Sequence, residues 1–433
     1  MTQPPVSSGP PRGGEAPAAL EGLPGSAWMA QRVAAPGSAA APPVELPAAA
    51  NSPWAQASRI LAIRLDNLGD ILMTTPALRA LRQQLPGRHI ALLAGGAGLA
   101  LAPFLPEVDE VIPAACPWMP GPAPTPAALA ETVARLRAGR FDAAVIFTVY
   151  SQSALPAAML CWQAGIPLRL AYGRENPYHL LTDWVADPEP HELLRHEVRR
   201  QLDLVARVGA VADDDRLSFA IPPQARERAR ARLAEAGIDA GRPYVVVHPG
   251  ASAASRRYPP AQFAAALRRL AELSGLQAPQ LVFTGDDGEV ALVEEIRLGA
   301  GPSATLAGRL QLGELAAVLD DSALLLANNT GPVHLAAALG TPVVDLYALT
   351  NPQHAPWKTP AAVLYEDVPC RYCYRSVCPQ GHHACLHLLA PERVAAAARR
   401  LLDEGAETAV AEPPAPPPLR PSSPLPPARP NGG

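Results

Sequence analysis

The chain has 433 residues, of which 48% are hydrophobic, and this length gives room for two ordinary domains with cores of their own. Its 36 basic and 40 acidic side chains leave a net charge of −4, so no overall basic field favours nucleic acid as a partner. Lys358 is the only lysine. We therefore expect any anion that meets a side-chain cation to meet arginine or histidine.

Both ends of the chain are expected to be disordered tails. Residues 1–57 and 406–433 are rich in Pro, Ala, Gly and Ser, and such sequence buries too little apolar surface to offset chain entropy. We find no secretory-signal pattern and no stretch near the roughly 20 apolar residues of a membrane span. The protein is expected to be cytoplasmic, with peripheral contact to the inner membrane face left open.

Between the tails, apolar runs alternate with helical patterns, which predicts parallel sheets covered by helices in an α/β fold. Strands are predicted at 59–64, 89–95, 142–147, 244–250, 280–286, 323–329 and 342–347. Helices are predicted at 71–85, 189–209, 224–237, 259–273, 287–298, 312–321, 331–339 and 391–403.

This rhythm predicts two Rossmann-like domains, one at 58–210 and one at 243–405, joined by an interdomain segment at 211–242. Ligands of open parallel sheets bind at the carboxyl ends of the strands. The loops that follow the strands are therefore the candidate sites.

The first such loop leads into a helix through Gly69 and Asp70. A carboxylate in the first helical turn is stabilised by the helix dipole. Asp70 is either a favourable residue for starting a helix or an anionic base at the mouth of a cleft.

The second loop, HPGASAASRRYPP at 248–260, combines small and hydroxyl residues with Arg256 and Arg257. Small residues allow close backbone approach to an anion, and arginine can clamp phosphate with two hydrogen bonds. A surface loop with two solvated arginines is the alternative.

The third loop is ANNTGPVHLAAALG, where a helix begins at Thr330, Gly331 and Pro332. Proline suits the first helical turn, and the free N–H groups there favour a phosphate. His334 lies in the first turns and either contacts the ligand or packs against neighbouring loops.

Common nucleotide motifs are absent: no GxxxxGK[ST] occurs, and GGAGLA at 95–100 is a weak dinucleotide fingerprint. Asp213 and Asp215 form a D-x-D that we interpret as a solvated turn between the domains. Nothing in these motifs requires metal-dependent phosphate chemistry.

Four segments in this order resemble glycosyltransferase family 9, the ADP-heptose:lipopolysaccharide heptosyltransferases. The resemblance covers roughly residues 58–404 and is specific as a combination. The segments are LGDILMTTPALRALR, HPGASAASRRYPP, LAGRLQLGELAAVL and NNTGPVHLAAALGTPVV.

The resemblance implies a GT-B architecture, with an acceptor-side domain first and a nucleotide-sugar domain second. It implies inverting transfer of a heptose-like sugar from a nucleotide-diphosphate sugar, with ADP as the expected nucleotide. The acceptor would be a hydroxyl of a lipopolysaccharide core or another glycan or glycolipid. The resemblance also implies that catalysis requires no metal or other cofactor.

Carried over by position, Asp70 matches the catalytic base. Ser252 and Arg256 match the loop that binds the donor phosphate, where the family often has lysine in place of Arg256. The remaining matches concern the donor: Thr330, Gly331 and His334 at the diphosphate, and Leu310 and Asp287 near the nucleoside.

Two amides depart from the family's pattern. Asn329 stands where the family commonly has aspartate before [ST]-Gly, and Asn351 where it often has aspartate in Thr-Asp-Pro. An amide does not repel an anion and can donate to phosphate or sugar. Both are candidates for the donor site, and they motivate an alternative, a nucleotide-sugar-binding protein without catalysis. Another GT-B enzyme, such as a nucleotide-sugar epimerase, is a further alternative.

Six cysteines in a chain of this length do not indicate a disulfide framework, but four of them cluster as C-x2-C-x4-C-x6-C. Four thiolates at short spacing could bind structural zinc or an iron–sulfur cluster, or could remain reduced or pair as disulfides. Their position after the last predicted strand indicates a structural role. The cluster consists of Cys370, Cys373, Cys378 and Cys385.

Overall fold

The computed structural model describes residues 52–119, 121, 124–190, 192–275 and 278–408. The chain forms two six-stranded sheets whose strands are all parallel. The strand orders are β3-β2-β1-β4-β5-β6 and β12-β11-β10-β7-β8-β9. In each sheet the order in which the strands follow one another reverses between two central strands, β1 and β4 in one and β7 and β10 in the other. In parallel sheets the loops diverge at such a point and leave a crevice for ligands.

The strands of the first sheet are β1 (Arg59–Ile63), β2 (His89–Ala94), β3 (Glu110–Pro113), β4 (Ala143–Ile146), β5 (Leu168–Gly173) and β6 (Asp183–Ala186). Those of the second are β7 (Tyr244–His248), β8 (Gln280–Phe283), β9 (Ala304–Thr305), β10 (Leu324–Asn328), β11 (Val343–Leu346) and β12 (Ala361–Leu364). All seven predicted strands are confirmed; β3, β5, β6, β9 and β12 were not predicted.

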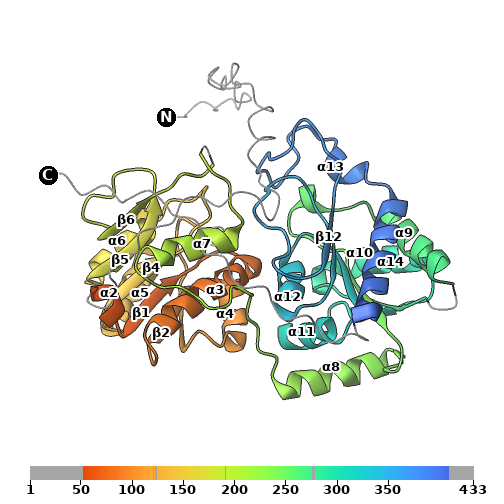
Figure 1. The fold of residues 1–433 in the computed structure, drawn as a ribbon, viewed down its shortest axis with the longest axis horizontal. Helices are drawn as coiled ribbons and strands as arrows, with labels where there is room; N and C mark the ends of the chain where they lie inside the picture. The colour runs from red at the N-terminus through yellow and green to blue at the C-terminus, as the bar shows by residue number, and fades with distance from the viewer. Residues whose placement is uncertain (1–51, 120, 122–123, 191, 276–277, 409–433) are drawn as a thin grey trace, which may run out of the picture. The chain divides into compact units, whose positions relative to one another are not determined.

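Helices cover both sheets (Figure 1). The first half contains α2 (Pro53–Gln56), α3 (Leu68–Gln84), α4 (Gly96–Leu101), α5 (Pro126–Ala138), α6 (Leu155–Gln163) and α7 (Glu197–Ala206). The second contains α8 (Pro223–Glu235), α9 (Pro260–Ser274), α10 (Val290–Ala300), α11 (Leu312–Asp320), α12 (Gly331–Leu339), α13 (Ala384–His387) and α14 (Pro391–Thr408). Short 3-10 turns are η2 (Ala102–Phe104), η3 (Ala254–Arg256) and η5 (Asp287–Glu289).

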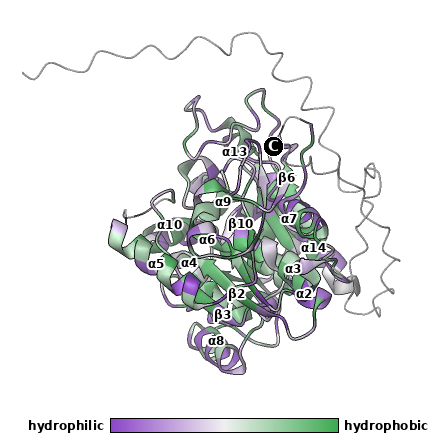
Figure 2. Ribbon diagram, turned by 90° about the vertical axis from the view of Figure 1, so that its left-hand side faces the viewer, coloured by the Kyte–Doolittle hydropathy of each residue, from purple (hydrophilic) through white to green (hydrophobic). Residues whose placement is uncertain are grey.

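Both faces of each sheet are buried, as parallel sheets require. In β1, Ile60 and Ala62 belong to one hydrophobic cluster, whereas Leu61 and Ile63 belong to the cluster on the opposite face. The strands are accordingly coloured hydrophobic in Figure 2, whereas α8 carries many hydrophilic residues. Because both faces of such strands are buried, apolar and polar residues do not alternate along them, and their sequences are continuous apolar runs.

Helices α3 and α12 pack against each other and join the cores of the two sheets. Ile71 and Leu72 of α3 belong to the same hydrophobic cluster as Val333 and Leu335 of α12. The two helices that follow β1 and β10 are therefore fixed beside one another. This contact places the loops at the ends of β1 and β10 in one neighbourhood.

The predicted tail at residues 1–57 is too long, because residues 52–57 belong to the folded part of the chain. Trp54 is only 3% exposed, and its indole donates to Asp183 at 2.9 Å. The buried Arg88 donates to the backbone carbonyls of Trp54 and Ala57. Residues 1–51 and 409–433 lie outside the described part of the chain, and the division into domains at 58–210, 211–242 and 243–405 stays a prediction.

The helix predicted at 189–209 is wrong in its first third, because α7 begins at Glu197. The backbone N–H of Arg195 donates to the Glu189 carboxylate at 2.7 Å, which folds this stretch into a turn. His196 then caps the helix by accepting from the backbone N–H of Val198 at 3.2 Å. Among the described residues, no helix has the length and apolar character needed to cross a bilayer.

Candidate functional site at the strand ends

Asn328 closes β10 and fastens the loop that follows β7. Its side-chain oxygen accepts from the backbone N–H of Tyr258 at 3.0 Å, and its amide nitrogen donates to the Pro249 carbonyl at 2.6 Å. Asn328 is fully buried, so these bonds satisfy polar groups that water cannot reach. The first amide of the NNTG sequence therefore holds two loops together at the crevice of the second sheet.

Asn329 is also used within the protein. Its amide nitrogen donates to Asp345 Oδ2 at 2.9 Å and to the His354 carbonyl at 3.0 Å. Burial raises the pKa of Asp345 to about 8, although the Asn329 bond opposes that rise. Asn351 likewise engages the chain, since its Oδ1 accepts from the backbone N–H of Gln353 at 2.8 Å. The two candidate donor-site amides thus shape loops.

The start of α12 has no side-chain cap from the described residues. Thr330 occupies the N-cap position, but its hydroxyl donates to the Asn328 carbonyl at 3.3 Å, and no described side chain caps the helix. Gly331 begins the helix next to Leu68 of α3. Uncapped N–H groups at the positive end of a nine-residue helix suit an anion.

His334 packs against the first turn of α3. A Cβ atom on Gly69 would lie 2.4 Å from His334 Cδ2, so only glycine fits at that position. The ring is 4% exposed, and its Nδ1 has no hydrogen-bond partner in the described part of the chain. Burial, together with the nearby His354, His196 and Arg256, holds the pKa of His334 well below its ordinary value. His334 is thus a neutral packing residue beside Asp70.

Ser252 and Arg256 lie in the loop after β7. Ser252 is exposed and Arg256 is half-buried. Burial raises the pKa of Tyr347, and the Arg256 charge opposes that rise. The buried Ser255 ties this loop to a distant segment, because its hydroxyl donates to the Arg375 carbonyl at 2.9 Å.

The two weaker nucleoside candidates lie further along the second sheet. Asp287 is exposed at the start of η5, and its carboxylate oxygen would lie 2.8 Å from a Cβ placed on Gly308. Leu310 is half-buried and packs against the main hydrophobic cluster. Glu289, which sequence reasoning did not single out, covers Gly250 so closely that a Cβ there would overlap its carboxylate.

Asp70 stands at the third position of α3, after β1. Its Oδ2 accepts from the backbone N–H of Asn67 at 3.2 Å, and its Oδ1 lies 3.3 Å from Arg64 Nη2. His354 Nε2 approaches the same oxygen to 3.9 Å. The side chain keeps 12% of its surface exposed. The carboxylate is therefore fixed in orientation and remains partly exposed.

Arg64 is a buried centre of charge that the sequence did not reveal as such. Its guanidinium meets Asp66 at 2.9 Å, Glu197 at 2.9 Å and Asp70. Burial alone would raise the pKa of Glu197, but Arg64, His354 and Arg200 outweigh it and bring the pKa below its ordinary value. The sequence feature that could have predicted this buried charge is an arginine at the end of an apolar strand.

The segment after Asn351 contacts α7. The backbone N–H of Glu197 donates to the Gln353 carbonyl at 3.0 Å, and His196 Nε2 lies 2.8 Å from the Ala355 carbonyl oxygen. Trp357 donates to the Asp215 carbonyl at 2.7 Å. Asp215 is buried and pairs with Arg199 and Lys358, so the interpretation of this D-x-D as a solvated turn is wrong for Asp215, although Asp213 is exposed.

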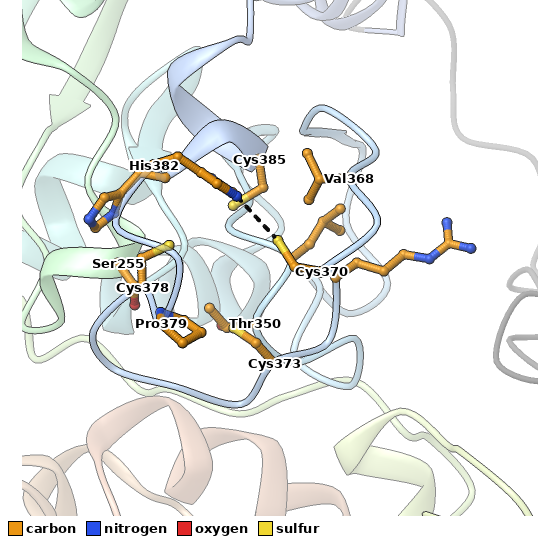
Figure 3. A pocket seen from close by; sticks show the side chains of 12 residues that line it. Ser255, Thr350, Val368, Cys370, Cys373, Cys378, Pro379, His382 and Cys385 are labelled. Carbon is orange, nitrogen blue, oxygen red and sulfur yellow. Dashed lines mark hydrogen bonds between the residues drawn. The ribbon is translucent and has the colours of Figure 1, made fainter. Parts of the chain in front are cut away.

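The four clustered cysteines line one pocket together with His382 (Figure 3). All four are free thiols in the structure. Burial raises the pKa of Cys385, and the three neighbouring thiols add to that rise. Among the described residues, no three His, Cys, Asp or Glu side chains are already gathered as metal ligands.

Two six-stranded parallel sheets, each covered by helices, form the GT-B architecture of glycosyltransferases, which the solved heptosyltransferase structures below share. The sequence model of glycosyltransferase family 9 (heptosyltransferase) matches residues 130–384. The chain therefore belongs to this family.

The relatives agree with this assignment. A lipopolysaccharide heptosyltransferase 3 from Escherichia coli is 25% identical over 308 residues, 67% of this chain and 83% of that protein. A family 9 glycosyl transferase structure from Veillonella parvula has a TM-score of 0.68 and 24% identity, covering 80% of this chain and 98% of that one. The E. coli ADP-heptose lps heptosyltransferase II structure has a TM-score of 0.63 and 22% identity, covering 80% and 99%.

Gly69→Ala should disturb the site more than the fold. The added Cβ overlaps the His334 ring, so α3 and α12 must separate at Asp70, at a cost of about 1–3 kcal/mol. Alanine favours a helix by roughly 1 kcal/mol, which offsets part of that cost. We expect a loss of transferase activity with a small change in thermal unfolding temperature.

Gly96→Ala is the matched control, because a Cβ at this helical glycine meets nothing within 4 Å. It should leave activity unchanged. Full activity in Gly69→Ala would contradict the tight packing between α3 and α12.

Three buried histidines should make stability depend on pH. Burial lowers the pKa of His196 and of His248 to about 4 and that of His334 well below 6.5. The unfolded chain then binds more protons than the folded chain below pH 6.5, so stability is intact above this pH and falls as the pH drops. The loss between pH 7.5 and 5.5 should be roughly 1 kcal/mol for each histidine.

Urea unfolding at the two pH values measures this loss. His248→Asn should reduce the pH-dependent loss by about one histidine's share, whereas His179→Asn, at an exposed histidine, should not. An unchanged pH dependence in His248→Asn would contradict a buried neutral imidazole.

Proposed function

We propose that this protein is an inverting glycosyltransferase that moves a heptose from an ADP-linked donor to a hydroxyl of a lipopolysaccharide-core acceptor. Membership of glycosyltransferase family 9 supports the reaction class, and the printed names of its relatives support heptose and the lipopolysaccharide core. The observation that carries the proposal is the carboxylate of Asp70 beside the uncapped start of α12.

Asp70 serves as the general base in this proposal. Its carboxylate accepts the proton of the acceptor hydroxyl while that oxygen forms a bond to the anomeric carbon. The bond from the same carbon to the donor phosphate breaks on the opposite side, so the configuration inverts. Asn67 and Arg64 hold the carboxylate in place, and orientation of this kind lowers the barrier.

The departing nucleoside diphosphate develops negative charge. The N–H groups at Thr330 and Gly331, together with the Arg256 guanidinium and the Ser252 loop, are suited to stabilise it. These groups offer positive charge without a metal ion, which is the basis for proposing that the transfer step needs none. His334 contributes by packing against Gly69, and Asp287 and Leu310 remain proposed contacts of the nucleoside.

The proposed partners are the nucleotide-sugar donor and a glycolipid or glycan acceptor. An acceptor anchored in lipid would bring the enzyme to the cytoplasmic face of the inner membrane as a peripheral protein. We propose no direct role for Asn329 and Asn351 at the donor, because their side chains bond to Asp345, the His354 carbonyl and Gln353.

Asp70→Asn should keep the fold and donor binding but lower the turnover by a factor of about 100 or more, since an amide cannot accept the proton. The assay follows transfer from ADP-heptose to a heptose-free lipopolysaccharide core and the anomeric configuration of the product. Asp213→Asn, an equal change in charge at an exposed loop, is the control.

Wild-type turnover in Asp70→Asn would refute the base. Donor binding with no transfer by the wild-type chain would favour a binding protein, and epimerised sugar nucleotide would favour an epimerase.

Arg256→Ala should lower kcat/KM for the donor by about 100-fold, because a charge-assisted contact to the leaving phosphate is lost. Arg256→Lys keeps the charge but not the planar fork. It should retain activity within about tenfold of wild type. Steady-state kinetics with varied donor measure both, and equal activity of the alanine and lysine variants would contradict a phosphate contact.

A further inference from the structure

A cavity of about 280 Å³ lies at the carboxyl ends of β1 and β4, and we call it the β1–β4 cavity. The strand order of the first sheet reverses between these two strands, where open parallel sheets place their ligands. Small-molecule sites have volumes of roughly 300–1,000 Å³. The β1–β4 cavity is near the lower end of this range, which suits one sugar unit better than a longer segment.

The lining of the cavity is apolar where it is buried and polar where it is exposed. Ile63 and Ile146 at the strand ends are buried, and the half-buried Trp118 packs against the same hydrophobic cluster. Ser151 and Ser153 are exposed and bring hydroxyl groups to the edge. An apolar interior with a few polar groups at fixed places is typical of a small-molecule site.

Trp118 keeps a ring face and an indole N–H for a ligand. The indole N–H groups of Trp54, Trp184 and Trp357 each donate to an oxygen within the protein. For Trp118, no described residue accepts from the indole N–H, and no described ring or arginine stacks on it. The face of an aromatic ring is weakly negative and attracts C–H groups such as those on the apolar face of a sugar.

The polar edge of the cavity is backed by carboxylates. Gln152 donates its amide N–H to Asp66 Oδ1, and Ser153 Oγ donates to Glu175 Oε1 at 2.9 Å. None of the described residues that line the cavity is charged. A carboxylate or phosphate placed here would lose water, meet no cation in the lining and lie near other negative charges. Uncharged hydroxyl groups carry no such cost.

The arginines of this region are engaged by other groups of the protein. Arg64 is fully buried and meets three carboxylates. Arg174 Nη2 lies 3.6 Å from Asp187 Oδ2, and its guanidinium lies 5.8 Å from the centre of the Tyr150 ring. Neither arginine lines the cavity.

We propose that the β1–β4 cavity binds an uncharged sugar unit of the acceptor and discriminates against acidic and phosphorylated sugars at that position. The apolar face of the sugar ring lies against Trp118, and its hydroxyl groups contact Gln152 and Ser151. This proposal rests on the transferase function proposed above and names the class of sugar that the acceptor side takes.

Asp66 connects the cavity to the proposed base. Its Oδ1 accepts from Gln152 in the lining, and its Oδ2 lies 2.9 Å from Arg64 Nε. Arg64 Nη2 in turn lies 3.3 Å from Asp70 Oδ1. The same buried guanidinium therefore orients the edge of the cavity and the carboxylate that accepts the proton.

Binding of three sugars to the full chain in the presence of ADP tests the charge selectivity. The probes are a methyl heptoside, the same heptoside carrying one phosphate, and the methyl glycoside of a 2-keto sugar acid. By calorimetry, the neutral heptoside should bind at least about tenfold more tightly than either charged probe. Equal or tighter binding of a charged probe, or no binding of the neutral heptoside, would overturn the proposal.

Variants of Trp118 test the location. Trp118→Ala should weaken binding of the neutral heptoside by about tenfold, whereas Trp118→Phe, which keeps an aromatic face, should stay within about threefold of wild type. Trp162→Ala, at an exposed tryptophan outside the cavity, is the control. ADP affinity should be unchanged in all three. Wild-type heptoside affinity in Trp118→Ala would contradict the stacked sugar.

An added charge at the exposed edge tests the same idea in a variant that leaves the core untouched. Ser151→Arg should raise the affinity for the phosphorylated heptoside by about tenfold, because it supplies the missing cation. Ala138→Arg adds the same charge at an exposed position of α5 and should have no such effect. An equal response of both variants would overturn the assignment of the edge.

Transfer assays separate this proposal from the function on which it rests. Neutral heptoside bound at Trp118 but never glycosylated from ADP-heptose would count against the transferase and leave the sugar site standing. Transfer to charged acceptors alone would leave the transferase standing and overturn the neutral site. Quenching of Trp118 by octanol, with no response to any sugar, would assign the cavity to an alkyl chain and overturn it as well.

Discussion

The contact between Gly69 of α3 and His334 of α12 is the constraint on which the site depends. The start of α3 carries the Asp70 carboxylate, and the start of α12 carries uncapped N–H groups. Both could contact one ligand only if the two helices pack closely together. The absence of a Cβ at Gly69 allows that approach, and the shared apolar cluster of Ile71 and Val333 secures it. The Asp70 carboxylate and the uncapped N–H groups of α12 thereby lie on neighbouring helices that follow strands of different sheets.

The charges behind Asp70 explain how a carboxylate stays fixed there. Arg64 is fully buried and meets Asp66, Asp70 and Glu197, so one cation neutralises only part of the surrounding negative charge. Buried ion pairs contribute little net stability, but removing one partner is costly. His354 approaches Asp70 and Glu197 at 3.9 and 4.0 Å. The cluster thus orients the Asp70 carboxylate and contributes little net stability.

Much of the fold was predictable because the sequences of buried parallel strands are apolar runs, as in RILAI and LLLAN. The missed strands β3, β6 and β9 are short edge strands with polar or proline residues, which carry no such signal. Asp70 and the α12 turn were found from local motifs, and their roles stay predictions. Arg64, Glu197 and His354 meet only through tertiary structure, at separations along the chain that no local pattern records.

The amide at Asn329 follows from the residue on the neighbouring strand. β10 and β11 are adjacent and parallel, and Asp345 on β11 is fully buried with Asn329 as its donor. An aspartate at 329, as the family commonly has, would place two carboxylates together in a buried site, and one would have to be protonated. The amide avoids that repulsion and donates to the His354 carbonyl as well. The amide in the NNTG motif therefore answers the buried carboxylate on the neighbouring strand, and the start of α12 at Thr330 keeps no side-chain cap among the described residues.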